Sequence, residues 1–405
     1  MRELKGNWHD LFNGFSVAFD IKKMFAVFIA LALTVIIVVV IPWLTVLAID
    51  PAALNKIDLK PALADCANCK CGISVSFGED KAMTSQIACN HQELGRQARY
   101  VLHTTMGFYK WPFLTVLGLL LLAVWGYFGG MVTRIAAINL TKDESLSFGK
   151  ASAFASKKFM SFFSPVVVCI MGILFFSLCN VAGGLIGLIP VVGPILVAIG
   201  LPLAILSGFI ILFIIIGLLS HILFYPTIGV EGTDTFDAIS RSFQYLYARP
   251  WHYLWYTLTA IAYGIPTIMF VMFFVRAMIK IGVGTASMGM GISMHNILSL
   301  TNLPIVDCLK VGVPMDMGAP ISVAYYIAAV IMAIWLILIC GLAVSYVISY
   351  SLSANTIIYL LLRKQVDEID MKEVYEEETE ELMTGNIPVA PPSASDKPDD
   401  KPKIN

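Results

Sequence analysis

The chain has 405 residues, of which 58% are hydrophobic and only 14% are charged, against about 25% charged in an average soluble domain. A soluble globule of this size needs far more polar surface, so the composition excludes a soluble enzyme and indicates a multipass membrane protein. The net charge of −1 also argues against a protein that binds nucleic acid through a strongly basic surface.

Six apolar segments are long enough to cross about 30 Å of hydrocarbon as helices. The first is longer than the core of a signal peptide, which is about 7–15 residues, so we expect a retained helix. Taken in pairs, the six spans form three helical hairpins. The sequence therefore predicts an all-α polytopic membrane protein with spans at residues 24–49, 111–132, 162–189, 195–225, 251–275 and 321–362.

The placement of Lys and Arg predicts which side of the membrane each segment occupies. The basic segments 1–23, 133–161, 226–250 and the start of 363–405 all fall on one side, which we expect to be cytoplasmic. Segments 50–110 and 276–320 then lie outside, and the first is long enough to be translocated whatever its charge. We therefore expect both termini, including an acidic and then disordered tail, on the inner side of a bacterial cytoplasmic membrane.

An internal repeat precedes the first and third spans. GFSVAFDIKKMF, residues 14–25, and GKASAFASKKFM, residues 149–160, align their Gly, Ala-Phe and Lys-Lys without a gap, and a looser third copy precedes residue 251. Polar and apolar residues at near-helical spacing before a basic pair predict short interfacial helices, although any juxtamembrane segment is basic and aromatic. The candidates for contact with anionic lipid headgroups are Lys22, Lys23, Lys157, Lys158 and Arg249.

The third copy also carries a resemblance to known proteins. The stretch DAISRSFQYLYARPWHYLWYTL resembles a recurring element of a broad group of bacterial multipass proteins without a settled activity. That group includes the membrane domain attached to some glycerophosphodiester phosphodiesterases. The resemblance covers about 30 residues around 234–260 and implies a helical membrane fold. It implies no phosphodiesterase activity, because the chain has no soluble segment long enough for that catalytic domain.

Five of the eight cysteines fall on the predicted outer side: Cys66, Cys69, Cys71, Cys89 and Cys308. Outside the cytoplasm disulfides are the default, and the four in segment 50–110 allow three pairings. One alternative is a zinc or other soft-metal site that uses the same four thiolates and His91, and unpaired thiols are another. The sequence favours a small outer domain at 50–110 with disulfides and no bound cofactor.

The predicted spans carry no Asp, Glu, Lys or Arg at their centres, which disfavours an ion-coupled carrier. Arg276 and Lys280 lie one helical turn apart just after the fifth predicted span. We expect them to extend outward to the interface, with a site for an anionic headgroup or solute as the alternative. The chain contains no phosphate-binding loop, zinc-protease motif, nucleophile elbow or dinucleotide fingerprint, so we do not expect an enzyme.

Two functions remain. The first is a non-enzymatic scaffold, assembly factor or lipid-interacting subunit, whose partners are membrane lipids and a protein bound through residues 50–110 or the tail. The alternative is a permease for an apolar or lipid-like molecule, not coupled to ions. The glycine- and proline-rich turn around 183–202 and the repeat favour this alternative, because such features occur in transporter folds.

Overall fold

The structure is a computed structural model and describes residues 6–42, 110–190, 192–301 and 323–375. Within these ranges the regular structure is entirely helical, without strands. Six of the described helices are long and apolar enough to cross a membrane, so the chain is a multipass membrane protein with an all-α fold, as predicted. These helices are Ile21–Val40, Trp111–Lys142, Phe159–Ile186, Val192–Glu231, Pro250–Met290 and Val323–Val366.

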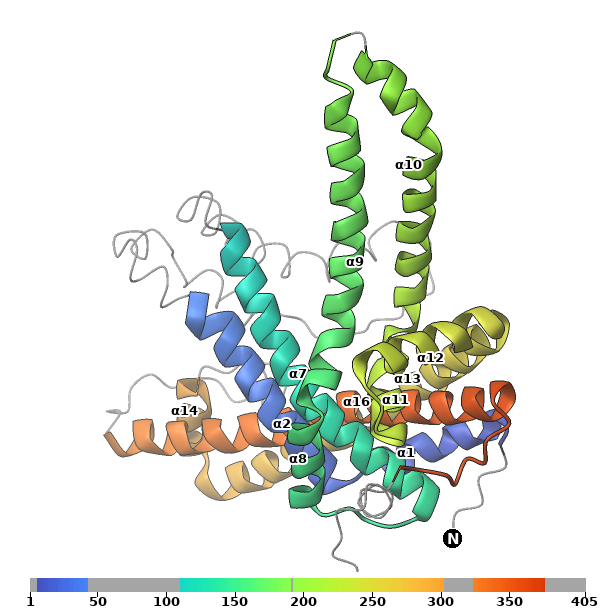
Figure 1. Cartoon of the computed structure of the whole chain (residues 1–405). Helices are drawn as coiled ribbons and strands as arrows, with labels where there is room; N and C mark the ends of the chain where they lie inside the picture. The colour runs from blue at the N-terminus through green and yellow to red at the C-terminus, as the bar shows by residue number, and fades with distance from the viewer. Residues whose placement is uncertain (1–5, 43–109, 191, 302–322, 376–405) are drawn as a thin grey trace, which may run out of the picture.

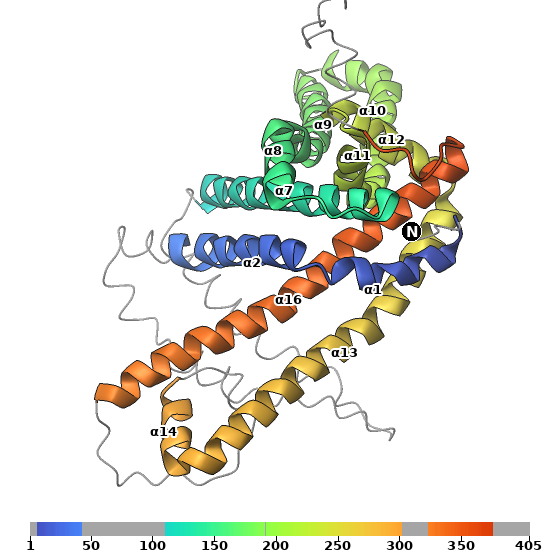
Figure 2. The same ribbon diagram turned by 90° about the horizontal axis from the view of Figure 1, so that it is seen from below.

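The long helices pack as three pairs. In the first, α2 (Ile21–Val35), which ends in the π-helical turn η2 (Ile36–Val40), packs against α7 (Lys110–Lys142). In the second, α9 (Phe159–Ile186) packs against α10 (Val192–Gly217). In the third, α13 (Pro250–Met290) packs against α16 (Val323–Val366). Figures 1 and 2 show that the three pairs share a base and diverge from it in different directions.

Short helices gather at this shared base, which we call the hub. They are η1 (Trp8–Phe12), α1 (Asn13–Ala18), α8 (Phe148–Lys157), η4 (Leu218–Leu223), α11 (Phe224–Glu231) and α12 (Thr235–Ala248). Local sequence sets several helix ends. Asp20 caps α2 by accepting a hydrogen bond from the Lys22 amide at 3.0 Å, and Gly232 ends α11 in the left-handed conformation. A further helix, α14 (Ile292–Leu300), lies beside α16 away from the hub (Figure 2).

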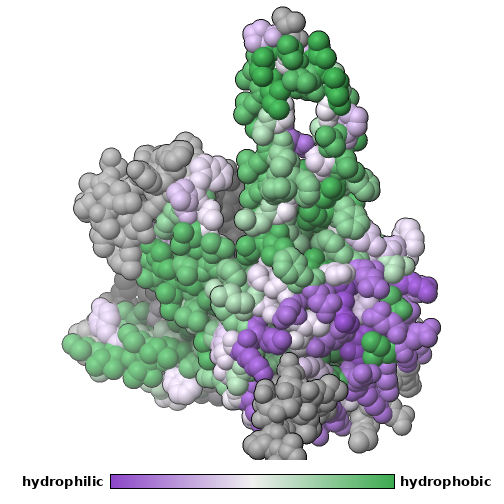
Figure 3. Space-filling view, in the orientation of Figure 1, coloured by the Kyte–Doolittle hydropathy of each residue, from purple (hydrophilic) through white to green (hydrophobic). Residues whose placement is uncertain are grey.

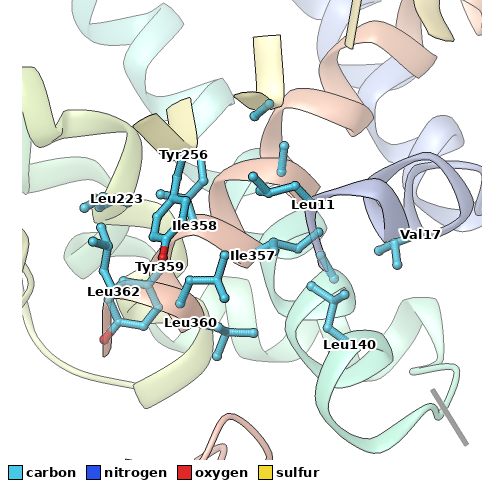
Figure 4. Packing of buried hydrophobic residues seen from close by; sticks show 14 of the residues in the cluster. Leu11, Val17, Leu140, Leu223, Tyr256, Ile357, Ile358, Tyr359, Leu360 and Leu362 are labelled. Atoms are coloured by element: carbon cyan, nitrogen blue, oxygen red, sulfur yellow. The ribbon is translucent and has the colours of Figure 1, made fainter. Parts of the chain in front are cut away.

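The end of α16 forms the centre of the hub. Residues 356–363 are buried without interruption, and α1, α7, α11, α12, α13 and η4 all contact this helix. A helix that is covered on every side needs apolar residues around its whole circumference, which the sequence TIIYLLL supplies. Figure 4 shows Ile357, Tyr359 and Leu362 of α16 packed among Leu11, Leu140 and Leu223 from three other segments. The hub is therefore the main hydrophobic core of the described chain.

The second pair leaves the hub at an irregular turn. The helix that starts at Val192 tightens into the 3-10 turn η4 before it continues as α11. The hydroxyls of Tyr247 and Tyr253 each donate a hydrogen bond of 2.6 Å to backbone carbonyls beside this turn, those of Phe213 and Leu219. Backbone groups released from regular helical bonding need such partners. The junction between α12 and α13 thus fixes the base of the α9–α10 pair.

The fifth span extends further than its hydropathy predicts. The sequence assigns residues 276–320 to a loop, whereas α13 continues to Met290 and α14 follows, so this part of the loop prediction is wrong. Arg276 and Lys280 lower the hydropathy, but both residue types form helices well. Ile279, between them, is buried against Leu336 of α16 and keeps the extended helix attached. The second span also extends further than predicted, because α7 continues past residue 132 to Lys142, whereas the starts of the second and fifth spans agree with the predicted residues 111 and 251 within one residue.

Most of the apolar surface of the long helices is exposed. In five of the six spans only 17% of the most apolar window is buried, and in the first span 28% is buried. Figure 3 shows hydrophobic residues covering the α9–α10 pair and hydrophilic residues gathered around the hub. Much of the surface of the three pairs is therefore open to lipid, although α16 also packs against α2 and α7 through Ile348 and Leu352.

Candidate functional site

The hub contains a cluster of charged side chains around Glu231, at the end of α11. Its carboxylate accepts a hydrogen bond from the Tyr359 hydroxyl and forms ion pairs with Arg241 and, at 3.6 Å, with Arg363. The side chains of Arg363 and Glu231 are only 3% and 11% exposed. Removing such charges from water costs several kcal/mol each, and the cost is offset when the charges pair and their remaining polar atoms are hydrogen-bonded.

Two arginines hold the segment that follows α16 against the hub. Arg363 donates hydrogen bonds to the carbonyls of Asp370 at 2.9 Å and Glu373 at 2.6 Å. Arg134 of α7 donates to the carbonyl of Gly229 at 3.0 Å and to that of Tyr375 at 2.8 Å. The Tyr375 amide in turn donates to Val230, next to Gly229 in α11. The segment 367–375 is therefore bound to both α7 and α11, far from it in sequence.

The titratable groups of α12 belong to the same cluster. Burial and the hydrogen bond that Tyr245 donates to Asp367 raise the pKa of the Tyr245 hydroxyl, so it stays a donor. Partial burial disfavours the charge of Arg241, but the carboxylates of Glu231 and Asp237 outweigh it and raise the pKa of the guanidinium. Most charged groups of the hub thus pair with one another, although the Nε of Arg363 is buried without a hydrogen-bond partner among the described residues, and the pairs hold the bases of the helices together.

A second site lies beside the hub, in a groove between α13 and α16. Its volume is about 250 Å³, close to the lower end of the range of about 300–1,000 Å³ for small-molecule sites. Thr257, Ile261, Ile265 and Ile268 line it from α13 at helical spacing, and Val347, Ser351, Asn355 and Ile358 face them from α16. Ala260, Gly264, Tyr350 and Ala354 complete the lining. The groove is mostly apolar and carries a few neutral polar groups.

The lysines before the first span do not share one environment. Lys22 is half-buried, and its ammonium donates hydrogen bonds to Ser145 at 3.3 Å and to the Leu146 carbonyl at 3.1 Å. Lys23 is 0% exposed, and its ammonium donates to the Val17 carbonyl and to Ser353 of α16. The predicted headgroup contact of Lys23 is therefore wrong. The side chain turns into the hub, because carbonyl and hydroxyl oxygens there solvate the ammonium.

The other predicted headgroup contacts lie on the surface. Lys157 and Arg249 are exposed, and Lys158 is half-buried beside Asp234, with 3.6 Å between the two charged groups. Arg276 and Lys280 are exposed on α13, and neither contributes to the hub or the groove. These positions remain candidates for lipid contact, and the structure does not bring them together in one site.

The two clear copies of the repeat occupy different environments. Phe19 is 56% exposed, whereas Phe154, at the matching position, is 2% exposed and packs under the Arg134 guanidinium, 4.4 Å from the ring centroid. Lys23 is buried, whereas its counterpart Lys158 pairs with Asp234 near the surface. The first copy breaks its helix at Phe19 and Asp20, the second at Lys158. Matching residues of the two copies are therefore buried to different extents.

We expect the burial of Lys23 to be visible in its chemical reactivity. A water-soluble amine-reactive reagent should modify Lys157 at least roughly tenfold faster than Lys23 in the folded protein, because a fully buried ammonium is reached only through local opening. Peptide mass spectrometry over a time course measures both rates in one sample. Denaturation in SDS should make the two rates similar, and equal rates in the folded protein would contradict the buried position.

The remaining predicted site residues lie outside the described part of the chain. These are Cys66, Cys69, Cys71, Cys89, His91 and Cys308, so the disulfide and metal hypotheses for them stay predictions. Among the described residues, Cys169, Cys179 and Cys340 are free thiols, and no group of three or more metal-ligating side chains gathers.

The chain matches no protein-family model, no curated protein and no solved structure. The resemblance noted around residues 234–260 therefore stays a prediction, and the site has to be interpreted from its own geometry. Sequence reasoning used Arg134, Arg241 and Arg363 only for membrane orientation and did not single out Glu231. Ser351 and Asn355 were also not predicted as site residues, because neither is ionisable, although two polar residues one helical turn apart in an apolar run are a recognisable signal.

Proposed function

We propose that this chain is a non-enzymatic membrane scaffold that binds lipid between its three helix pairs. The observation that carries the proposal is the divergence of three largely unburied apolar pairs from one hub that buried charges hold together. Rigid helices that separate inside a bilayer leave space with apolar walls. Lipid chains fill such space at no hydrophobic cost, whereas water does not.

The proposal includes an orientation. The hub lies at the cytoplasmic surface of a bacterial cytoplasmic membrane, with both termini inside, because the Lys- and Arg-rich segments converge there. The helices α8 and α12 lie along the interface before the third and fifth spans. Trp251 and Trp255, which are 79% and 56% exposed at the start of α13, lie at the headgroup level that such rings prefer. In each hairpin one span crosses the membrane outward from this surface and the next span returns to it.

A scaffold role suits the chemistry of the hub. The Glu231 carboxylate pairs with two guanidiniums, and the hydroxyls of Tyr245 and Tyr359 donate to carboxylates. Such a network orients helices and leaves little capacity to bind or transform a polar substrate. The alternative role, a permease for a lipid-like molecule, is favoured by one observation, the groove between α13 and α16.

Two measurements on the full chain test the proposal. The first is native mass spectrometry of the protein released from nanodiscs, which should show retained lipid in a fixed ratio to the protein. The second is a flip assay in proteoliposomes with fluorescent phospholipid and dithionite. Dithionite quenches only the fluorescent lipid in the outer leaflet. If the chain is a scaffold, the unquenched fluorescence of the inner leaflet should equal that of liposomes without protein, about half of the total.

The outcomes separate the two roles. Retained lipid without faster flipping supports the scaffold. Retained lipid together with faster quenching of the inner-leaflet fluorescence supports the permease and contradicts the scaffold. A chain that retains no lipid, and co-purifies instead with a stoichiometric protein, contradicts lipid binding as the role of the helix pairs.

A further inference from the structure

We propose that the groove between α13 and α16 binds one lipid with a small uncharged polar head, such as the hydroxyl and ester carbonyls of a diacylglycerol. The inference rests on the proposed function and names the class of lipid and its site.

Close contacts between the two helices fix the back of the groove. The Tyr350 hydroxyl donates a hydrogen bond of 2.8 Å to the Ala260 carbonyl. Gly264 lies so near the Tyr350 ring that a Cβ there would meet it at 2.6 Å. On the far side of α13, Phe12 of η1 packs edge-on against Tyr263 with 4.7 Å between ring centroids. The groove is therefore closed behind by packed side chains.

The front of the groove opens toward lipid. Ile261 and Ile265 line it and are 54% and 55% exposed, although they lie in a membrane-spanning helix. Their exposed faces, with Ile268 and Val347, form an apolar channel along the pair. A hydrocarbon chain is the partner whose chemistry matches these walls, because burying it there loses nothing relative to the bilayer and gains packing contacts.

The polar groups of the groove divide into satisfied and available ones. The Thr257 hydroxyl donates to the Tyr253 carbonyl at 2.8 Å, and the Tyr350 hydroxyl donates to the Ala260 carbonyl. Within the described chain, the side chains of Ser351 and Asn355 make no hydrogen bond with another residue. An amide in hydrocarbon without a partner costs a few kcal/mol, so a ligand that supplies hydroxyl or carbonyl groups is stabilised at this position.

Charge and depth decide which lipid head fits. The groove lining contains no Lys, Arg, His, Asp or Glu, so nothing in it compensates a phosphate. Asn355 precedes Arg363 by eight residues, or about 12 Å along the helix, and Ser351 lies about one turn further. A headgroup that reaches these side chains must leave the interface. A small neutral head does so at modest cost, whereas a charged one does not.

The test uses the full chain in nanodiscs with two photoactivatable probes, a diacylglycerol and a phosphatidylglycerol that carry the same photoreactive acyl chain. We expect the diacylglycerol probe to label peptides that contain residues 257–268 and 347–358 more strongly than the phosphatidylglycerol probe does. The combined change Asn355→Leu and Ser351→Ala should lower that labelling roughly tenfold, or about 1.4 kcal/mol of binding free energy, since it removes both side chains that can hydrogen-bond the head. Crosslink mapping by mass spectrometry measures the yield.

Two further variants keep the result interpretable. Thr259→Val changes a half-buried hydroxyl of α13 that donates to the Trp255 carbonyl and does not line the groove, so it should leave the labelling unchanged. Ile265→Trp fills the groove from an exposed position and should abolish labelling while the thermal unfolding temperature stays near that of the original chain. The second variant also decides the question if the polar double variant does not fold.

Three results would overturn the inference. One is equal labelling by the two probes, another is labelling that survives both groove variants, and the third is labelling confined to other helices. If native mass spectrometry still finds retained lipid in these cases, the scaffold proposal stands and only the groove assignment fails. If no lipid is retained at all, the proposed function fails first and the groove assignment with it.

Discussion

Replacing Glu231 by Gln is expected to lower the free energy of unfolding by about 3–5 kcal/mol. The change keeps the size of the side chain and removes the only carboxylate that the described chain places beside the buried guanidinium of Arg363. That guanidinium is 3% exposed, so it would remain in the hub without a counter-charge. Arg241 would lose one of its two carboxylate partners at the same time. Denaturant or thermal unfolding of the protein in a mild detergent measures the loss.

Asp237 of α12, one helical turn before Arg241, provides a matched control. Asp237→Asn removes a carboxylate from the same cluster, but this side chain is 44% exposed and pairs with Arg241 near solvent. Such pairs contribute about 0–1 kcal/mol, so the control should stay near the original stability. The joint change Glu231→Leu and Arg363→Met should recover part of the loss, because it removes both buried charges. Equal stability of the Glu231 and Asp237 variants would show that the hub does not depend on the buried pair.

Arg134→Met is expected to release the segment after α16 and to cost about 2–3 kcal/mol, the value of hydrogen bonds to a charged donor. The guanidinium joins α7 to the carbonyls of Gly229 and Tyr375 and lies over the Phe154 ring. Methionine fills much of the same volume without these donors. Hydrogen exchange should therefore accelerate at the amide of Tyr375, which donates to the Val230 carbonyl, and in neighbouring amides of 370–375.

Arg249→Met serves as the control for that experiment. Arg249 is exposed at the start of α13, so the same substitution there should change neither exchange in 370–375 nor the unfolding transition by more than about 0.5 kcal/mol. If exchange at Tyr375 is the same in the Arg134 variant and the original chain, the segment is held by other contacts, such as those of Arg363.

The fold class was predictable because hydropathy is a local property. A run such as ALALTVIIVVVI cannot be covered by the polar surface of a soluble protein, and a helix satisfies its backbone in lipid without help from other segments. The same reasoning failed at residue 276. A charge lowers the mean hydropathy of a window, yet it does not end a helix whose next apolar residue, Ile279, packs against Leu336.

The hub was not predictable, because its contacts join residues that are distant in sequence. Glu231 and Arg363 are each an ordinary charge at the end of an apolar run, and nothing local indicates that they meet. Lys23 and Lys158 occupy matching positions in the repeat, but only Lys23 has the oxygens of Val17 and Ser353 within reach. Burial there depends on where α1 ends and on the approach of α16, which periodicity does not specify. Asn355 likewise indicates a binding groove only once α13 is known to lie beside it.

The segment that follows α16 also determines when the hub can finish folding during synthesis of the chain. Arg134 and Glu231 leave the ribosome well before two of their partners, Tyr375 and Arg363, since Arg363 follows Glu231 by about 130 residues, or roughly 6–26 s of synthesis at about 5–20 residues per second. During that interval the first four apolar helices are already inserted while two charges of the unfinished hub lack their final partners. Closure comes only when Arg363 and the stretch up to Tyr375 emerge and dock. Assembly of this fold therefore ends after translation of the last span, and a nascent chain that stops before Arg363 cannot close the hub.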